Sequence, residues 1–185
     1  MHPYRMQRLI KERGKDEVID VTQRASLYQT IARLEREGLI GRQQVTRDEN
    51  RPERTVYEIT AAGRAIAIEW LHQVLAQPAR EFTEFPAAIS HLALLTPEDA
   101  LHQLELRLPG IEAEIAWIEQ GLEQARLVPR LFLLEMELLR ATRVTELTWV
   151  RSVVADLRSQ QLTWSEAWIR RVAAQLAAAG VTGDE

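Results

Sequence analysis

The chain has 185 residues, 46% hydrophobic and 27% charged, a balance that excludes disordered and fibrous classes and fits one large domain or two small ones. Cysteine is absent, which excludes disulfides, thiolate metal sites and a cysteine nucleophile. No apolar run approaches the roughly 20 residues of a membrane-spanning helix and the first residues resemble no signal sequence, so we expect a cytoplasmic protein without a membrane partner. With only 8 Gly and 7 Pro, the composition indicates a mainly α-helical fold.

The charge is unevenly distributed along the chain. Residues 1–80 hold 14 Lys and Arg against 11 Asp and Glu, whereas residues 81–185 hold 9 against 16. All but two of the cations are arginines, whose planar guanidinium suits phosphates and guanine edges. The mildly basic first half is therefore the part expected to contact a polyanion, although an ordinary solvated surface can have the same balance.

Two helices are predicted at the start of the chain. The first covers about residues 3–13 and ends at Gly14. The second begins after Thr22, a natural N-cap, and ends at Gly38, which can adopt the left-handed capping conformation. Its apolar side chains follow the i, i+4, i+7 spacing of a buried face: Leu27, Ile31 and Leu34.

Two short strands and a third helix are predicted to follow. The strands cover residues 39–46 and 54–59, with a polar turn over 47–53 between them. Thr60 then caps a helix whose apolar residues are Ile66, Trp70, Leu71, Val74 and Leu75. Helices followed by a hairpin with a charged tip indicate a winged helix-turn-helix, here of three helices plus a β-hairpin wing.

An ordered series of short motifs also carries a family resemblance. Leu27-Tyr28, the run LEREGLI at 34–40 and the pattern R-P-x-R-x-x-Y-x-I-T-x-x-G-R at 51–64 resemble the PadR family of transcriptional regulators. The resemblance covers about residues 1–76, and the acidic half resembles the all-helical C-terminal region of the longer members. It implies a regulator that binds double-stranded DNA as a homodimer built by its C-terminal helices.

The beginning of the chain resembles a segment that lies inside the family's domain. The sequence Met1-His2-Pro3-Tyr4 is similar to the family's Met-His-Gly-Tyr segment, which an apolar helix precedes. We therefore expect the first family helix to lie upstream of Met1 or to be missing.

The second helix is the candidate reader of DNA. With its apolar residues inward, its outer face is short-chained or hydrogen-bonding near the start and cationic later, as a major-groove helix requires. Gln29 can pair with adenine, whereas Arg33 and Arg36 suit phosphate. A plain solvated face is the alternative. The candidate DNA-binding residues, with those of the wing, are Thr22, Arg24, Ser26, Tyr28, Gln29, Arg33, Arg36, Arg51 and Arg54.

The sequence divides near Gln77-Pro78 into a DNA-binding domain, residues 1–77, and a helical dimerisation domain, residues 78–185. In the second domain Thr96-Pro97 starts a helix with a strict 3.5-residue apolar repeat: Leu101, Leu104, Leu108, Ile111, Ile115, Ile118 and Leu122. Pro109-Gly110 interrupts the repeat, which predicts a bend or two helices that share one stripe. Further helices are predicted over about 130–157, with Leu147, Val150, Val154 and Leu157 in a stripe, and after a capping box at Thr163–Glu166. These stripes fit a dimer or an intramolecular bundle.

An effector site is predicted among the tryptophans, all of which follow residue 69. Indole rings around a cavity suit a planar aromatic ligand, and two arginines on an apolar stripe would need an anionic partner. The alternative is that the tryptophans fill cores and the arginines reach Glu135, Glu137 or Glu146. The candidate effector-binding residues are Trp117, Arg140, Arg143, Trp149, Trp164 and Trp168.

No catalytic motif is present, so we expect neither an enzyme nor a bound cofactor. The chain has no nucleophile elbow, phosphate loop or dinucleotide glycine pattern. Glu98, His102 and Glu105 share a helix face, but such mixtures are common on exposed helices and we expect no metal site. A helical adaptor that uses its winged helix to bind proteins is the alternative to a regulator.

Overall fold

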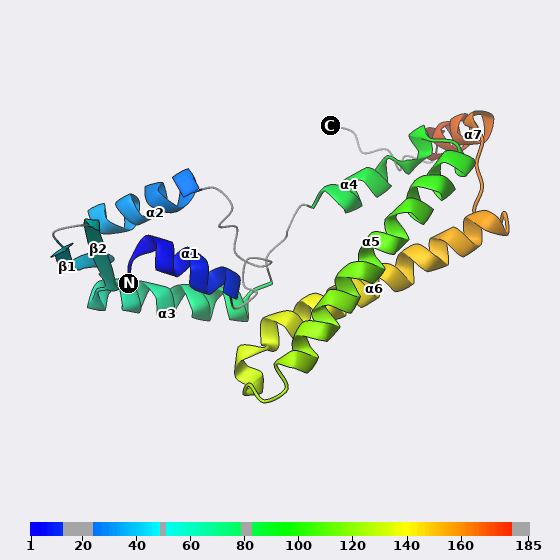
Figure 1. Ribbon diagram of the computed structural model, residues 1–185. Coiled ribbons are helices and arrows are strands. Elements are labelled where there is room, and N and C mark those ends of the chain that lie inside the picture. Colours follow the sequence, from blue (N-terminus) through cyan, green and yellow to red (C-terminus); the bar gives the residue numbers. More distant parts are fainter. Residues whose placement is uncertain (13–23, 49–50, 79–82, 179–185) are drawn as a thin grey trace. The chain divides into compact units, whose positions relative to one another are not determined.

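Three helices and a β-hairpin form the first of two units into which the chain divides in a computed structural model, Met1–Glu81 and Phe82–Glu185. The structure describes residues 1–12, 24–48, 51–78 and 83–178 (Figure 1). The elements of the first unit are α1 (Pro3–Glu12), α2 (Arg24–Arg36), β1 (Ile40–Asp48), β2 (Arg51–Ile59) and α3 (Ala61–Ala76). Those of the second are α4 (Glu84–Ser90), a 3-10 turn (Leu92–Leu94), α5 (Pro97–Gln124), a 3-10 turn (Arg130–Phe132), α6 (Leu134–Arg158) and α7 (Glu166–Ala178). The predicted fold class, a winged helix followed by an all-helical region, is confirmed.

The end of α2 is a glycine cap, as the sequence predicts. Gly38 has a φ of +71°, and its N–H donates to the carbonyl of Glu35 at 3.0 Å. The N–H of Leu39 donates to the carbonyl of Leu34 at 2.9 Å. These two bonds form a Schellman motif, which satisfies the last carbonyls of the helix and turns the chain into β1.

The start of α3 is fixed against that same turn. The Thr60 hydroxyl accepts a hydrogen bond from the N–H of Gly63 at 3.0 Å, so the predicted N-cap is confirmed. The hydroxyl also lies 2.8 Å from the carbonyl oxygen of Gly38 and 3.1 Å from that of Leu39, to which it can donate. A Cβ atom on Gly63 would lie 2.0 Å from the Leu39 carbonyl oxygen, so only glycine permits this approach.

The wing is an antiparallel hairpin that is longer than predicted. Its register runs from Ile40 opposite Ile59 to Asp48 opposite Arg51, with irregularities at two points. The expected turn over 47–53 is wrong in length because strand pairing continues into it. Pro52 lies in β2 at the second irregularity, where a residue without an N–H interrupts no regular ladder bond.

Few of the described side chains of the first unit are buried in the single chain. Ile31 is the inward residue of α2, with 6% of its surface exposed, and Leu27 and Leu34 beside it are half-buried, as predicted. On α3, in contrast, a set of large apolar side chains is exposed: Ile66, Ile68, Trp70, Leu71, Val74 and Leu75. This helix therefore presents an apolar surface that the described residues do not cover.

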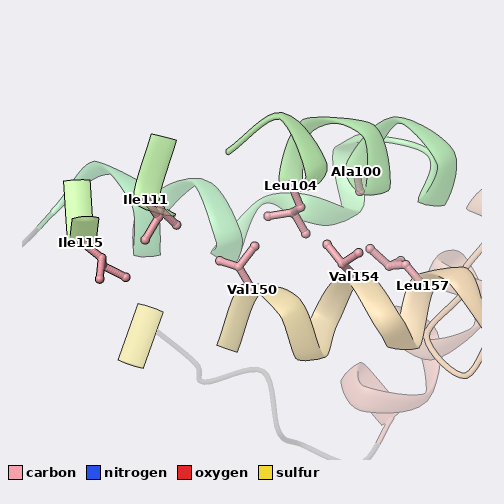
Figure 2. Packing of buried hydrophobic residues seen from close by; sticks show 7 residues of the cluster. All are labelled: Ala100, Leu104, Ile111, Ile115, Val150, Val154 and Leu157. Atoms are coloured by element: carbon pink, nitrogen blue, oxygen red, sulfur yellow. The ribbon is translucent and has the colours of Figure 1, made fainter. Parts of the chain in front are cut away.

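The second unit is built on an antiparallel pair of long helices, α5 and α6 (Figure 1). The predicted stripes face each other, and their buried members form the core that Figure 2 shows: Leu104, Ile111 and Ile115 of α5 with Val150, Val154 and Leu157 of α6. Ala100 is fully buried in the same cluster although the repeat did not include it.

A single helix runs through Pro109, so the alternative of two helices is wrong. Pro109 is exposed, whereas Leu104 and Ile111 on either side of it in sequence are buried against α6. The ring therefore faces away from the helix pair, and the hydrogen bond that proline cannot donate is lost on the solvent side. Packing of the stripe on both sides of the proline keeps the helix continuous.

The cap of α7 lies two residues later than predicted. The hydroxyl of Ser165 accepts from the N–H of Trp168 at 3.2 Å, so Ser165 rather than Thr163 is the capping residue. Trp164 precedes the cap, is half-buried against the core, and donates its indole N–H to the carbonyl of Leu95 at 2.9 Å. The anchoring of Trp164 before the helix displaces the start of α7 to Glu166.

Two glycines of the chain provide a matched stability test. Gly63→Ala forces a Cβ against the Leu39 carbonyl and should destabilise the first unit by more than about 2 kcal/mol. Gly110→Ala, inside α5 with no atom within 4 Å of the added Cβ, should stabilise the second unit by about 0.5–1 kcal/mol. Urea unfolding of the full chain measures both, and equal effects of the two substitutions would contradict the described close approach.

Candidate nucleic-acid interface

The outer face of α2 is exposed along its described length. Tyr28, Gln29, Arg33 and Arg36 are all exposed, while Ile31 is buried on the opposite face. The outward orientation predicted for Gln29, Arg33 and Arg36 is therefore confirmed, and Tyr28, which the sequence places on the flank, is exposed as well. The face offers an amide at one turn and guanidinium groups at the following turns, which can hydrogen-bond base edges and phosphates respectively.

The remaining sequence-predicted residues lie where the described structure is less complete. Thr22 lies outside the described residues. Arg24 and Ser26 belong to the first turn of α2, but their side chains lie outside the described part of the structure. The same holds for Arg51 and Arg54 of β2, which are opposite Asp48 and Thr46 in the register of the wing.

An ion pair that the sequence did not reveal joins α2 to the wing. Arg42 of β1 donates through Nε to Glu35 Oε1 at 2.5 Å and through Nη2 to Oε2 at 3.2 Å. Hydrogen bonding to the Glu35 carboxylate, and its negative charge, raise the pKa of the Arg42 guanidinium. Tyr57 lies opposite Arg42 on β2 and also raises this pKa. Glu35 lies in a helix and Arg42 in a strand, so the periodicity of a helix does not predict that the two meet.

The arrangement of this unit is that of a winged helix-turn-helix. An exposed polar helix face is followed by a hairpin, and α3 holds both through the turn at Leu39. Residues 1–68 match the sequence profile of the transcriptional regulator PadR-like family. The first unit is a PadR-like domain. The sequence resemblance is thus confirmed.

Solved structures of other proteins share the fold of the chain well beyond this domain. Bacillus subtilis PadR in complex with operator DNA is 18% identical, with a TM-score of 0.70 over 85% of this chain and 91% of that one. The same protein in complex with p-coumaric acid is 17% identical, with a TM-score of 0.65 over 85% and 90%. The Vibrio cholerae virulence activator AphA is 22% identical, with a TM-score of 0.54 over 72% and 77%. No curated protein matches the sequence.

The family that residues 1–68 match is one of transcriptional regulators and not of enzymes. Among the described residues, no three His, Asp or Glu side chains gather as a metal site. Glu105, one of the trio considered in the sequence, instead contacts Arg158 of α6 at 2.7 Å. Among the helices of the described ranges, none has the length and hydropathy needed to span a bilayer.

Outside the PadR-like domain, the two candidate effector arginines pair with carboxylates of the chain itself. Arg140 donates to Glu119 Oε1 at 2.5 Å and is exposed. Arg143 is half-buried and donates to Glu114 Oε1 at 2.8 Å and to Glu146 Oε2 at 2.9 Å. The predicted inward direction of Arg140 is wrong because the stripe rotates, so that the α6 arginines reach acidic residues along α5.

The candidate tryptophans do not converge on one cavity of the described structure. Trp149 lines a surface cavity of about 560 Å³ that is wide open to solvent, and its ring meets Phe85 edge-on with centroids 6.0 Å apart. The other lining residues are Ala141, Thr142, Thr145 and Glu146. Trp117 and Trp168 are exposed on α5 and α7, and Trp164 is held at Leu95. The sequence missed Phe85, which lies in a short helix without an apolar repeat.

The carboxylate of Glu146 joins the ion pairs of α5 and α6. Arg107 of α5 donates through Nε at 2.8 Å and through Nη2 at 2.5 Å to its Oε1, and Arg143 donates to its Oε2. Burial of this side chain, which is 15% exposed, opposes ionisation. The hydrogen bonds and charges of the two arginines outweigh burial, so the pKa of Glu146 is lowered.

We expect Glu146 to make the helix pair sensitive to acid. Because its pKa is lowered in the folded state, its stabilisation is present above the pKa of an unfolded glutamate, about 4.3, and is lost as pH falls through the lower folded value. Glu146→Gln should lower the thermal midpoint at pH 7 and flatten its decline in acid. Glu123→Gln, at an exposed pair with Arg126, serves as the control. An unchanged acid profile in Glu146→Gln would contradict this role.

Proposed function

We propose that the protein is a sequence-specific repressor that binds a pseudo-palindromic operator as a homodimer. The observation that carries the proposal is the exposed polar face of α2 within a PadR-like domain that continues into a wing. Repression in this scheme needs no chemistry, because occupancy of the operator blocks transcription. Two copies related by a two-fold axis would place their α2 helices in successive turns of the major groove.

The DNA contacts proposed for the PadR-like domain follow from side-chain chemistry. Gln29 would read a base edge, whereas Arg33 and Arg36 would contact phosphates. Tyr28 and Arg24 at the flanks would contact the backbone, and Thr22 and Ser26 the first bases. Arg51 and Arg54 of the wing would contact phosphates or the minor groove.

A homodimer is supported by the apolar surface that the single chain leaves exposed. In the second unit, proposed as the dimerisation domain from residue 78 onward, the exposed large apolar side chains include Leu106, Trp117, Leu131, Phe132, Leu138 and Trp149. A monomer rarely leaves such a surface uncovered. Symmetric pairing of the C-terminal helices would bury it and supply the two recognition helices of a two-fold operator.

A small aromatic acid is proposed as the effector that releases the DNA. The fold is shared with Bacillus subtilis PadR, which has been solved in complex with p-coumaric acid. The cavity beside Trp149 has apolar and hydroxyl-bearing walls, which suit such a ligand. Release would follow if the ligand favoured a dimer with another spacing of the recognition helices. Trp117, Arg140, Arg143, Trp164 and Trp168 remain predicted ligand contacts from the sequence, but none of them lines this cavity.

Single substitutions in α2 separate reading of bases from contact with phosphates. Gln29→Ala should cost about 1–3 kcal/mol on the operator and relax preference at one base pair. Arg33→Ala should weaken binding to all DNA sequences alike and reduce the dependence of the affinity on salt. Fluorescence anisotropy on an operator selected from random DNA measures both, with Gln120→Ala on α5 as the matched control. Wild-type affinity in both variants would show that α2 is not the reader; no selected DNA at all would favour the protein-binding adaptor.

The effector cavity is tested with two threonines of the same helix. Thr145 lines the cavity and Thr148 does not, and each hydroxyl donates to the carbonyl four residues earlier, at 2.9 and 2.8 Å. Thr145→Phe should abolish release of operator DNA by p-coumaric acid, whereas Thr148→Phe should retain it. Loss of release in Arg140→Ala without unfolding would instead place the anchor at Arg140. Equal release by all three variants would exclude both locations.

A further inference from the structure

The ion pair between Glu35 and Arg42 fixes orientation as well as distance. Two N–H groups of the guanidinium contact the two oxygens of one carboxylate, at 2.5 and 3.2 Å. Such a fork holds the two planar groups in one relative orientation, which a single contact would not do. Glu35 is in the last turn of α2 and Arg42 is the third residue of β1. The pair therefore ties the recognition helix directly to the wing.

The backbone between Glu35 and Arg42 does not by itself fix the angle between α2 and the wing. The Schellman bonds at Gly38 and Leu39 close the end of α2, and Thr60 binds the carbonyls of these same two residues. These contacts hold the turn, whereas the hairpin extends from it as a two-stranded ribbon whose own tilt they leave open. A two-stranded ribbon twists readily. The ion pair acts beyond the turn, at the base of the ribbon.

The constraint extends from β1 to β2 through the register of the hairpin. Arg42 lies opposite Tyr57, and the paired strands continue to Arg54 and Arg51 near the tip. Tyr57 is also held from its other side, since its N–H donates to the carbonyl of Met1 at 3.0 Å. A fixed Arg42 therefore fixes the direction in which the wing carries its cations.

We infer that Glu35 and Arg42 are positioning residues that set the angle between α2 and the wing and thereby the sequence preference of the PadR-like domain. The inference rests on the proposed reading of DNA by α2 and the wing. Hydrogen bonds to base edges require a fixed helix position, whereas long arginine side chains reach phosphates from many positions. Loss of the pair therefore weakens operator binding more than nonspecific binding.

The opposing assignment is that Arg42 contacts a phosphate. In that case Glu35 competes with the phosphate for the guanidinium and adds a negative charge near the DNA. Removal of the Glu35 charge would then strengthen binding to all DNA sequences. Removal of the Arg42 charge would weaken binding to all of them and reduce the dependence of the affinity on salt. The two assignments thus predict opposite signs for the same Glu35 variant.

The experiment compares Glu35→Gln, Arg42→Gln, both together, and the charge exchange E35R/R42E in the full chain. Affinities are measured by anisotropy at several salt concentrations, on the operator selected by the wild type and on a scrambled duplex. We expect each single variant to lower the ratio of operator to scrambled affinity about tenfold, the double variant to lower it no further, and the exchange to recover most of it. Salt slopes should stay unchanged. Glu37→Gln, an exposed acid in the same turn, is the control and should behave as wild type.

A second measurement, without DNA, keeps the inference independent of folding and of the proposed function. Amide hydrogen exchange over residues 40–48 should be faster in Glu35→Gln than in Glu37→Gln, with α5 and α6 unchanged. Unchanged exchange, tighter DNA binding by Glu35→Gln, or a reduced salt slope in Arg42→Gln would overturn the positioning role. A wild type that prefers no DNA sequence would overturn the proposed function, while exchange would still decide whether the pair ties the wing to α2.

Discussion

The carbonyl group of Leu39 is the point on which the geometry of the PadR-like domain depends. It accepts from the N–H of Thr60 at 3.0 Å, lies within hydrogen-bond reach of the Thr60 hydroxyl, and leaves space for Gly63 only because glycine has no Cβ. One backbone group thus joins the end of α2, the hairpin and the start of α3. The wing therefore begins and ends beside the end of α2, because both of its strands return to this point.

The second unit depends on a different combination of forces. An apolar seam between α5 and α6 supplies non-directional attraction, while ion pairs on its flanks favour one antiparallel register. Exposed pairs such as Arg151–Glu112 contribute little stability singly. Together they select one register between α5 and α6, because a shift of either helix by one turn would separate every pair at once. A unit proposed to pair with a second copy benefits from helices that cannot slide.

Local chemistry explains why some features were predictable and others were not. Gly38 and Thr60 act on backbone groups within a few residues, and the stripes of α5 and α6 follow a helix period, so the sequence predicts all of them. The cap at Ser165 depended on Trp164 reaching Leu95, and the pairing of Arg143 depended on how α6 rotates against α5. The Glu35–Arg42 contact likewise exists only after the chain reverses at Gly38. Candidate DNA contacts on α2 were accessible to sequence reasoning because orientation on one helix follows from its buried face.

The uninterrupted passage of α5 through Pro109 has a mechanical consequence. Proline cannot donate to the carbonyl of Glu105, so this turn of the helix lacks one of the bonds that stiffen its neighbours. The weak turn lies on the solvent side, while the seam against α6 stays packed beneath it. We therefore expect α5 to bend more easily at this turn than at its neighbours. A force applied at the end near Thr96 would then bend the helix here before it reached the loop beyond Gln124.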